Sequence, residues 1–380
     1  MNITAFSAIN FRNLAQVSIE PCPGVNVIYG DNGHGKTNLL EGISLFSGMR
    51  SFRGARNGQM IAEGEKFSRL ETSFFAESRD QDAAMVITDS ARDLTLNGVK
   101  KEAASSMIGR FCTVVFSPDR MLLITGGAAE RRRFIDAAMS QIQPGYTNVL
   151  YKFNQILQQR NTLLKDISAN PSLKSTMDVW DMSLASYGAA VICRRHNLVR
   201  QLMPIAAEIY GQMSSGREQL ELKYDCSLAR CLPDEILGGS RLNEAMAQIS
   251  EQYQNQLGES LASDMRLGYT FHGPQRDDLT VLINGRDART YGSQGQKRSS
   301  VLSLKLAEAA LLADLLDERP VALLDDVMSE LDASRQDFLL NRLQGWQVFI
   351  TCCDPGPLRL LDSGSIFRVE SGVVTQMRGE

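Results

Sequence analysis

The sequence predicts an α/β fold in which a long, mainly helical segment interrupts a strand-rich domain. Three observations predict this: a glycine-rich loop between an apolar strand and a helix near the N-terminus, two acidic residues after another apolar strand near the C-terminus, and helical periodicity between them. The chain has 380 residues, 43% of them hydrophobic and 22% charged, which is typical of a soluble globular protein. We therefore expect the two ends of the chain to build one domain together.

The first 119 residues favour strands, with one helix among them. The Asn97-Gly98 pair lies between strand-forming residues and predicts a hairpin over 93–100. An apolar strand leads into the glycine-rich loop, and a helix over 38–46 follows the loop. Strands are expected over residues 3–10, 15–19, 25–29 and 114–116.

The run GDNGHGKT has the spacing of a phosphate-binding loop. Its glycines let backbone N–H groups converge on an anion, and the helix that follows adds unpaired donors. Lys36 is expected to reach the terminal phosphates of a nucleoside triphosphate, and the Thr37 hydroxyl to bind Mg²⁺. The residues expected at the nucleotide are Gly30, Asp31, Asn32, Gly33, His34, Gly35, Lys36, Thr37 and Asn38.

Residues 120–264 favour helices. Apolar residues spaced by three and four over 150–167 predict an amphipathic helix with coiled-coil-like spacing, although Arg160 interrupts its apolar face. A second helix is expected over 178–212, and alternating residues over 220–226 predict a strand. The two helices form either an antiparallel arm or part of an ordinary bundle, and both possibilities stay open.

Strands return after residue 265. The last expected elements are a strand before the Asn284-Gly285 turn, a helix from about 296 to 316, strands over 321–324 and 347–351, and a hairpin over 366–377. The strand over 321–324 leads directly into Asp325 and Asp326. Asp325 is placed to hold Mg²⁺ through water, and Asp326 to orient the attacking water as a general base. We therefore expect Asp326 and Lys36 to be catalytic, and Thr37 and Asp325 to bind the metal.

A second candidate anion site lies at Ser293, Gln294, Gly295 and Gln296, which open a helix. A simple helix cap would explain this turn as well. Its position upstream of Asp325 resembles the signature sequence of the ATP-binding cassette superfamily, in which one protomer covers the γ-phosphate held by another. More than half of the chain separates Lys36 from Ser293, which resembles the SMC branch rather than transporter cassettes.

The combination resembles the RecF family of bacterial recombination mediator ATPases nearly end to end. The segments that carry the resemblance are residues 10–14, 30–40, 50–53, 116–119, 130–136, 159–161, 180–181, 187–189 and 272–278. The chain departs from the family at Gln275, where a histidine is usual, and at Lys297, where glutamine is common. Compared with the superfamily, it has no lid glutamine after the strand at 114–116, no switch histidine near 351–354, and Asp326 in place of a glutamate. These three differences favour slow turnover.

The resemblance implies an ABC/SMC-like P-loop ATPase head built from residues 1–119 and 265–380, with a helical arm of residues 120–264 inserted. It implies an ATP-dependent homodimer in which one protomer supplies the phosphate loop and both acids and the other supplies Ser293. Arg12 is expected at the nucleotide. The family further implies slow ATP hydrolysis and clamping of double-stranded DNA near single-strand gaps and junctions. It also implies cooperation with RecR and RecO in loading RecA during recombinational repair, replication restart and the SOS response to DNA damage.

The net charge of −4 excludes a uniformly basic surface, so DNA contact requires local basic clusters. Arg131, Arg132 and Arg133 are the candidate cluster. The sequence shows neither a membrane-spanning run nor a secretory signal, so we expect a cytoplasmic protein without a membrane partner. Seven scattered cysteines, Cys231 among them, and three histidines do not favour a disulfide framework or a Cys/His metal site.

Two alternative functions stay open. A transporter ATPase subunit would need a membrane partner and a signature closer to Lys36. A nucleotide-gated adaptor would bind ATP without useful hydrolysis, an alternative that the short acid Asp326 keeps open. The roles of Arg276, Asp277 and Asp278 are undetermined, and a charged turn is the simplest interpretation.

Overall fold

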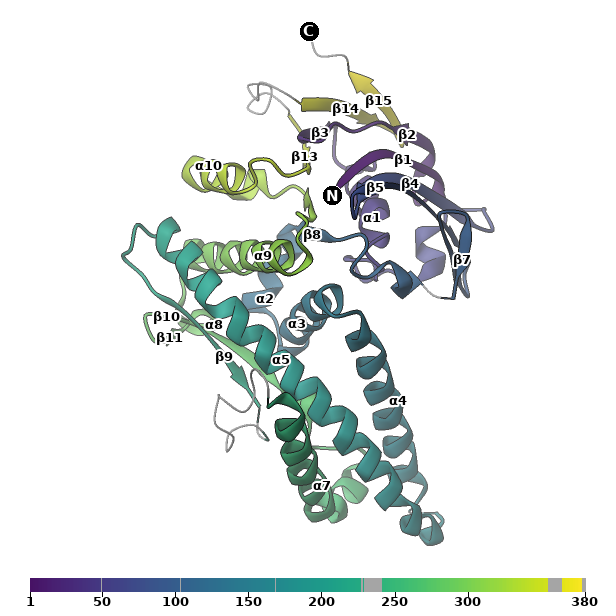
Figure 1. The fold of residues 1–380 in the computed structure, drawn as a ribbon, viewed down its shortest axis with the longest axis vertical. Helices are drawn as coiled ribbons and strands as arrows, with labels where there is room; N and C mark the ends of the chain where they lie inside the picture. The colour runs from purple at the N-terminus through teal and green to yellow at the C-terminus, as the bar shows by residue number, and fades with distance from the viewer. Residues whose placement is uncertain are drawn as a thin grey trace. The chain divides into compact units, whose positions relative to one another are not determined.

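The computed structural model describes residues 1–48, 50–102, 104–167, 169–226, 228, 241–354 and 364–377. The chain forms two compact units, coloured by residue number in Figure 1. The first, here called the head unit, comprises Met1–Met121 and Val301–Glu380, and the second, the arm unit, comprises Leu122–Ser300. The second junction comes later than the expected 264/265, because the strand at 278–283 pairs with the strand at 220–225 inside the arm unit.

The head unit contains a six-stranded, mostly parallel sheet in the order β15-β14-β3-β13-β12-β8. Four strand pairs are parallel, and β15 alone runs antiparallel to its neighbour β14. The strands are β3 (Val25–Tyr29), β8 (Thr113–Phe116), β12 (Val321–Leu324), β13 (Val348–Cys352), β14 (Gly364–Glu370) and β15 (Val373–Met377). Strand β12 and the edge strand β8 are buried along their whole length, as parallel strands covered on both faces require.

A second, antiparallel sheet of the head unit has the order β2-β1-β4-β5-β6-β7. Its strands are β1 (Asn2–Phe11), β2 (Leu14–Ile19), β4 (Ser68–Ala76), β5 (Arg79–Ile87), β6 (Arg92–Leu96) and β7 (Val99–Lys101). One hydrophobic core joins both sheets and helix α1 (Lys36–Leu45). Edge-to-face contacts of Phe46 with Phe6 and of Phe111 with Phe46 and Phe74 lie in this core.

The head unit also contains two longer helices near its C-terminal strands and several short 3-10 helices. Helix α9 (Gln294–Leu316) begins within the arm unit and continues into the head unit, and α10 (Ala333–Arg342) follows β12. Short 3-10 helices are η1 (Asn57–Met60), η2 (Ala104–Met107), η3 (Pro118–Met121) and η6 (Met328–Glu330). None of the described helices is both long enough and apolar enough to cross a bilayer.

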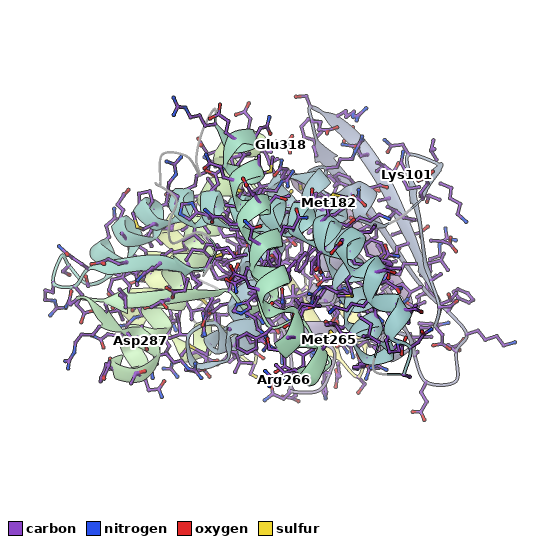
Figure 2. All side chains as sticks on the ribbon, turned by 90° about the horizontal axis from the view of Figure 1, so that it is seen from below. Lys101, Met182, Met265, Arg266, Asp287 and Glu318 are labelled. Atoms are coloured by element: carbon purple, nitrogen blue, oxygen red, sulfur yellow. The ribbon has the colours of Figure 1, made fainter. Side chains whose placement is uncertain are left out.

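The arm unit combines helices with a three-stranded sheet of order β11-β10-β9. The helices are α2 (Leu122–Thr125), α3 (Ala128–Ile142), α4 (Pro144–Asp166), η4 (Pro171–Thr176), α5 (Met177–Met213), α7 (Leu242–Leu267), η5 (Pro274–Arg276) and α8 (Ala288–Tyr291). The strands are β9 (Leu220–Asp225), β10 (Asp278–Ile283) and β11 (Arg286–Asp287). Helix α5 packs against both α4 and α7, so the described arm is not a simple two-helix pair. Met265 and Arg266 mark the C-terminal end of α7 in Figure 2, and Asp287 marks the end of β11.

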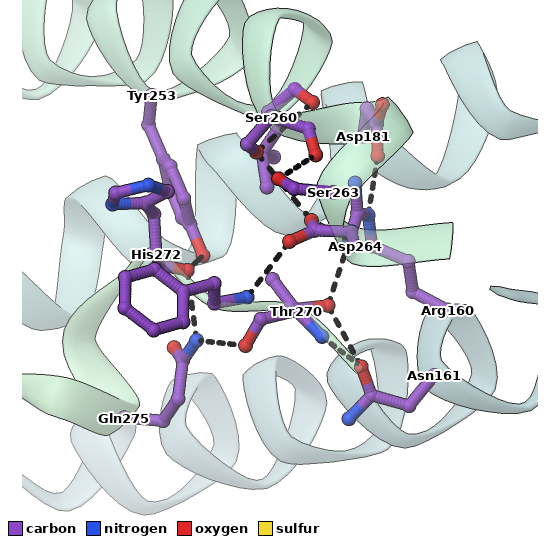
Figure 3. Close-up of polar contacts among 12 residues, drawn as sticks. Arg160, Asn161, Asp181, Tyr253, Ser260, Ser263, Asp264, Thr270, His272 and Gln275 are labelled. Carbon is purple, nitrogen blue, oxygen red and sulfur yellow. Dashed lines mark hydrogen bonds and ion pairs between the residues drawn. The ribbon is translucent and has the colours of Figure 1, made fainter. Parts of the chain in front are cut away.

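Arg160, which interrupts the apolar pattern of α4, is completely buried and paired with acids (Figure 3). Its Nε lies 2.6 Å from Asp181 Oδ1 on α5, and its Nη1 lies 2.8 Å from Asp264 Oδ2 on α7. Nη1 also donates to the Thr270 hydroxyl at 2.8 Å. The arginine therefore ties α4, α5 and α7 together, and the interruption that the sequence shows is a buried ionic cluster.

Candidate nucleotide-binding site

Three neighbouring parallel strands deliver the candidate site to one edge of the head sheet. Strand β13 pairs with β3 on one side and with β12 on the other. The phosphate loop follows β3, Asp325 and Asp326 follow β12, and Cys353 follows β13. Because carboxyl ends of adjacent parallel strands meet at one edge, residues far apart in sequence converge there.

The phosphate loop has a backbone that only glycine accommodates at two of its positions. Gly30 has φ 150°, and a Cβ atom there would lie 2.1 Å from the Val369 carbonyl oxygen. Gly35 has φ 114° and precedes α1, and a Cβ atom there would lie 2.7 Å from Asn13 Oδ1. The glycine spacing is thus a requirement of the loop's path and of its close packing.

Lys36 lies at the first residue of α1, and its side chain turns back to the loop. Its Nζ donates hydrogen bonds to the carbonyl oxygens of Gly30 at 2.7 Å and Asp31 at 3.0 Å. The residue is only 4% exposed. The ammonium group is therefore held beside the loop whose N–H groups would receive the phosphates.

Thr37 and Asp325, the two expected metal ligands, are brought together as predicted. The Thr37 hydroxyl donates to Asp325 Oδ1 at 2.8 Å, and the Thr351 hydroxyl donates to the same oxygen at 3.0 Å. Burial raises the pKa of Asp325, against the lowering effect of these two hydrogen bonds. A hydroxyl and a carboxylate are the hard oxygen donors that Mg²⁺ prefers, so this pair fits the metal.

Asp326 adopts a left-handed backbone conformation with φ 51°. Its N–H donates to the Thr351 hydroxyl at 2.9 Å, and its carbonyl oxygen accepts from the Ser329 hydroxyl at 2.7 Å. A non-glycine residue in this conformation costs about 1–2 kcal/mol, which the two hydrogen bonds help to offset. The backbone fixes the direction in which this half-buried carboxylate leaves the strand end.

Arg12 has an intramolecular partner instead of an open approach to the loop. Its guanidinium binds both carboxylate oxygens of Glu41, with distances of 2.7 and 2.8 Å. Glu41 is completely buried and also accepts a hydrogen bond from Ser51. The ion pair joins the end of β1 to α1, and the expected contact of Arg12 with the nucleotide stays a prediction.

Two residues beside the loop, Asn13 and Arg53, were not predicted as site residues, and both contact the predicted Asn38. Asn38 Nδ2 donates to Asn13 Oδ1 at 2.7 Å, and Asn13 Nδ2 donates to the Gly33 carbonyl at 3.2 Å. Arg53 Nη1 donates to Asn38 Oδ1 at 2.9 Å. Asn13 and Arg53 lie in segments that carry the family resemblance, which is the one signal in the sequence that could have found them.

A thiol stands near the position where the superfamily has its switch histidine. Cys353 is exposed, and its Sγ lies 3.2 Å from Asn32 Oδ1 and 3.9 Å from Lys36 Nζ. Burial raises the pKa of the preceding Cys352 to about 11. None of the six described cysteines forms a disulfide, and Cys231 lies outside the described residues. Among the described residues, no group of three or more His, Cys, Asp and Glu side chains is arranged to hold a metal ion.

Residues 293–296, here called the signature turn, belong to the arm unit and form a reciprocal helix cap. The Ser293 N–H donates to Gln296 Oε1 at 2.8 Å, and the Gln296 N–H donates to the Ser293 hydroxyl at 3.2 Å. Ser293 and Gln294 are exposed, while Gly295 and Gln296 are half-buried. The predicted helix cap is therefore present. The turn also leaves the N-terminal end of α9 exposed to solvent, where an anion could bind.

The three candidate DNA-binding arginines differ in their availability. Arg131 is 5% exposed and binds both carboxylate oxygens of Asp278 at 2.6 and 2.8 Å. Arg132 donates to the Asp277 carbonyl at 2.7 Å, whereas the exposed Arg133 pairs with Glu130 in its own helix turn. The guanidinium of Arg131 therefore serves the arm's own structure, and Arg133 is the exposed member of the three.

The same contacts explain part of the charged turn at 276–278. Burial alone would raise the pKa of Asp278, but its hydrogen bonds with Arg131 and with the Leu279 N–H, together with the charges of Arg131 and Arg132, lower it overall. Asp277 is buried, accepts a hydrogen bond from the Tyr224 hydroxyl, and has a pKa raised by burial. Arg276 is exposed, with its guanidinium over the rings of Tyr269 and Phe271. Gln275 donates to the His272 carbonyl at 2.7 Å, within its own turn.

Comparison with known proteins gives one consistent family. The model of the RecF/RecN/SMC N terminal domain matches residues 2–373. The DNA replication and repair protein RecF of Agathobacter rectalis is 39% identical over 353 residues, which cover 93% of this chain and 92% of that protein. RecF of Heliobacterium modesticaldum is 38% identical and covers 99% of both chains.

Solved structures agree with the sequence comparison. The recombination mediator protein RecF-ATPrS of the RecFOR pathway superposes with a TM-score of 0.90 at 34% identity, over 99% of this chain and 98% of that one. An SMC head domain from Pyrococcus furiosus superposes with a TM-score of 0.55 at 16% identity, which shows the fold alone. The predicted α/β P-loop fold of the ABC/SMC-like ATPases is therefore confirmed, and the chain belongs to the RecF family.

Proposed function

We propose that this protein is an ATP-gated DNA-binding protein of DNA replication and recombinational repair. The observation that carries the proposal is the hydrogen bond between Thr37 and Asp325. It joins the phosphate loop to the end of strand β12, as a magnesium site requires. The names of its relatives, DNA replication and repair protein RecF, and the solved RecF-ATP of the RecFOR pathway support the same conclusion.

The chemistry follows from the positions of the side chains. Lys36 would bind the terminal phosphate, and Thr37 and Asp325 would hold Mg²⁺, which would neutralise phosphate charge. Asp326 orients the attacking water, and its short side chain limits the rate, so the protein is a slow ATPase. Hydrolysis then serves to time a conformational state rather than to drive rapid turnover.

The γ-phosphate links two protomers. The phosphate loop and both acids belong to the head unit, whereas the signature turn at Ser293 belongs to the arm unit. ATP held by one protomer is covered by Ser293 of a second protomer, so ATP stabilises the homodimer and ADP releases it.

The ATP-bound dimer clamps double-stranded DNA near single-strand gaps and junctions, through phosphate contacts that do not read bases. Arg133 is the exposed arginine of the candidate cluster and is the one we assign to DNA contact. In this role the protein works in the cytoplasm with RecR and RecO to load RecA. Membership in the RecF family makes the transporter alternative unnecessary.

The test is equilibrium binding of a labelled DNA duplex with ATP, with ADP, and with the Lys36→Arg variant. We expect tight binding with ATP alone and its loss in the variant, because the lysine geometry at the γ-phosphate is required for closure. Nucleotide-independent binding would contradict ATP gating. Binding that follows ATP while phosphate release is unchanged in Asp326→Asn would favour the adaptor alternative, which binds ATP without useful hydrolysis.

A further inference from the structure

The signature turn continues into a chain of hydrogen bonds that ends inside the arm unit. We propose that Glu218 is a positioning residue that sets the signature turn for the γ-phosphate of the partner protomer and connects it to the long helix α5. This inference rests on the proposed function, because it needs Ser293 to meet nucleotide. Glu218 itself does not touch nucleotide.

Gln296 is the first link of the chain. Its Oε1 accepts the Ser293 N–H at 2.8 Å, and its Nε2 donates to Glu218 Oε1 at 2.7 Å. The second carboxylate oxygen, Oε2, accepts the Tyr210 hydroxyl at 2.7 Å. Tyr210 is completely buried in the last turn of α5. Glu218 therefore joins a buried side chain of α5 to an exposed turn at the start of α9.

The chemistry of the carboxylate decides how the glutamine amide is oriented. A side-chain amide has a donor end and an acceptor end, and its two orientations are nearly equal in shape. An ionised carboxylate only accepts hydrogen bonds, so Glu218 selects the orientation in which Nε2 faces it. Gln296 Oε1 must then face the Ser293 N–H, which fixes the turn that closes over the phosphate.

The backbone around Glu218 is held in place on both sides. The Glu218 N–H donates to the Ser214 hydroxyl at 3.3 Å. The next residue, Gln219, donates from its N–H to Asn284 Oδ1 at 2.8 Å and accepts the Asn284 N–H at 2.9 Å. These contacts fix the Glu218 backbone between the end of α5 and the β10–β11 turn, and the hydrogen bond from the Tyr210 hydroxyl holds its carboxylate beside Gln296.

The test measures ATP-induced dimerisation by sedimentation and, separately, nucleotide affinity of the protein at concentrations where it is monomeric. Glu218→Ala is expected to weaken the ATP-bound dimer about tenfold, or about 1.4 kcal/mol, because Gln296 loses the hydrogen bond that orients its amide toward Ser293. Nucleotide affinity of the monomer should stay unchanged, because the phosphate loop belongs to the head unit. Glu218→Gln, which keeps the shape without the acceptor-only carboxylate, should lie between wild type and Glu218→Ala.

The double variant Glu218→Ala with Gln296→Ala identifies the mechanism. If Glu218 acts through Gln296, the double variant is no weaker than Gln296→Ala alone, since linked residues are not additive. The matched control is Glu208→Ala, which removes the partner of Gln212 on the exposed side of α5. This control should leave the dimer unchanged, because it removes an exposed hydrogen bond of α5 that involves neither Gln296 nor Glu218.

Two outcomes separate the inference from the proposed function. Loss of the ATP-bound dimer in Ser293→Ala together with a normal dimer in both Glu218 variants would overturn the role of Glu218 and leave the composite site intact. A normal dimer in Ser293→Ala would overturn the composite site itself, and the inference with it. If Glu218→Ala does not fold, Glu218→Gln decides by the same measurements, and additive effects with Gln296→Ala would also overturn the inference.

Discussion

Cys353 is a single residue whose reactivity reports on the nucleotide site. It is exposed beside Asn32 and Lys36, whereas Cys112, Cys193 and Cys226 are buried. Buried thiols react slowly, so iodoacetamide should modify Cys353 first among the described cysteines. ATP with Mg²⁺ should slow this modification several-fold by covering the loop. The measurement is peptide mass mapping against time, with and without nucleotide.

The matching control is Cys353→Ser, which keeps a small polar side chain and should retain ATP binding after reagent treatment, while the treated wild type loses it. Peptide mapping also separates Cys353 from Cys231, which lies outside the described residues. Equal modification rates with and without ATP would place the bound nucleotide away from Asn32 and Lys36.

Some residues of the site could be predicted from their neighbours in the sequence, and others could not. Lys36 and Thr37 stand at fixed positions of a motif, and Asp325 follows an apolar strand, so these three were predictable. Thr351 binds Asp325 from the adjacent strand end at 3.0 Å, and a threonine at the end of a strand has no distinguishing pattern. Glu41 shows no signal either, because it lies in α1 while its partner Arg12 follows β1, and the pair forms only after folding.

At the scale of elements, the Arg160 cluster holds three helices of the arm unit together. Arg160→Ala would leave Asp181 and Asp264 buried without their cation. Removal of one partner from a buried ion pair costs about 3–5 kcal/mol. We therefore expect thermal or denaturant unfolding to show a large loss of stability in this variant, with the transition of the arm unit most affected.

Arg133→Ala is the control for this prediction, since its pair with Glu130 is exposed and should contribute less than about 1 kcal/mol. Arg160→Met should be as damaging as Arg160→Ala if the unpaired acids are the cause, and much milder if lost side-chain volume is the cause. A change below about 1 kcal/mol in Arg160→Ala would contradict the structural importance of the cluster.

Elements with local signals were predicted well, and elements defined by distant pairing were not. The hairpin of β6 and β7, the strands around the phosphate loop, and helix α5 all appear where turn residues or periodicity indicated them. The pairing of β9 with β10 was missed, because Leu220 and Ile283 are neighbours only across the inserted helix α7. That missed pairing is the reason the expected second junction at 264/265 differs from the junction after Ser300.

At the scale of the whole molecule, the two halves of the proposed ATP site lie in different compact units. Lys36 and Asp325 belong to the head unit, and Ser293 belongs to the arm unit. The sequence indicated both half-sites through their motifs. The sequence could not indicate that the signature turn belongs to the arm unit. Helix α9 runs without interruption from Gln294 to Leu316, so no break in the sequence marks the junction after Ser300.

This division predicts that two inactive variants restore each other's activity when mixed. Any dimer made of Lys36→Arg alone, or of Ser293→Ala alone, has two ATP sites that each lack one essential group. A mixed dimer has one site with both groups from its two protomers and one site with neither. ATP hydrolysis in an equimolar mixture should therefore reach up to about a quarter of the wild-type rate, because about half of the dimers are mixed and half of their sites are intact.

The double variant Lys36→Arg with Ser293→Ala, mixed with either single variant, is the control, since no combination then contains an intact site. Phosphate release and sedimentation in the presence of ATP measure turnover and dimer formation in the same samples. A mixture that hydrolyses ATP no faster than the average of its two components would mean that each protomer completes its own site, and the ATP-dependent dimer would lose its chemical basis. If ATP hydrolysis recovers in the mixture of the two single variants but not in the control mixtures, ATP must bind between the phosphate loop of one protomer and the signature turn of the other.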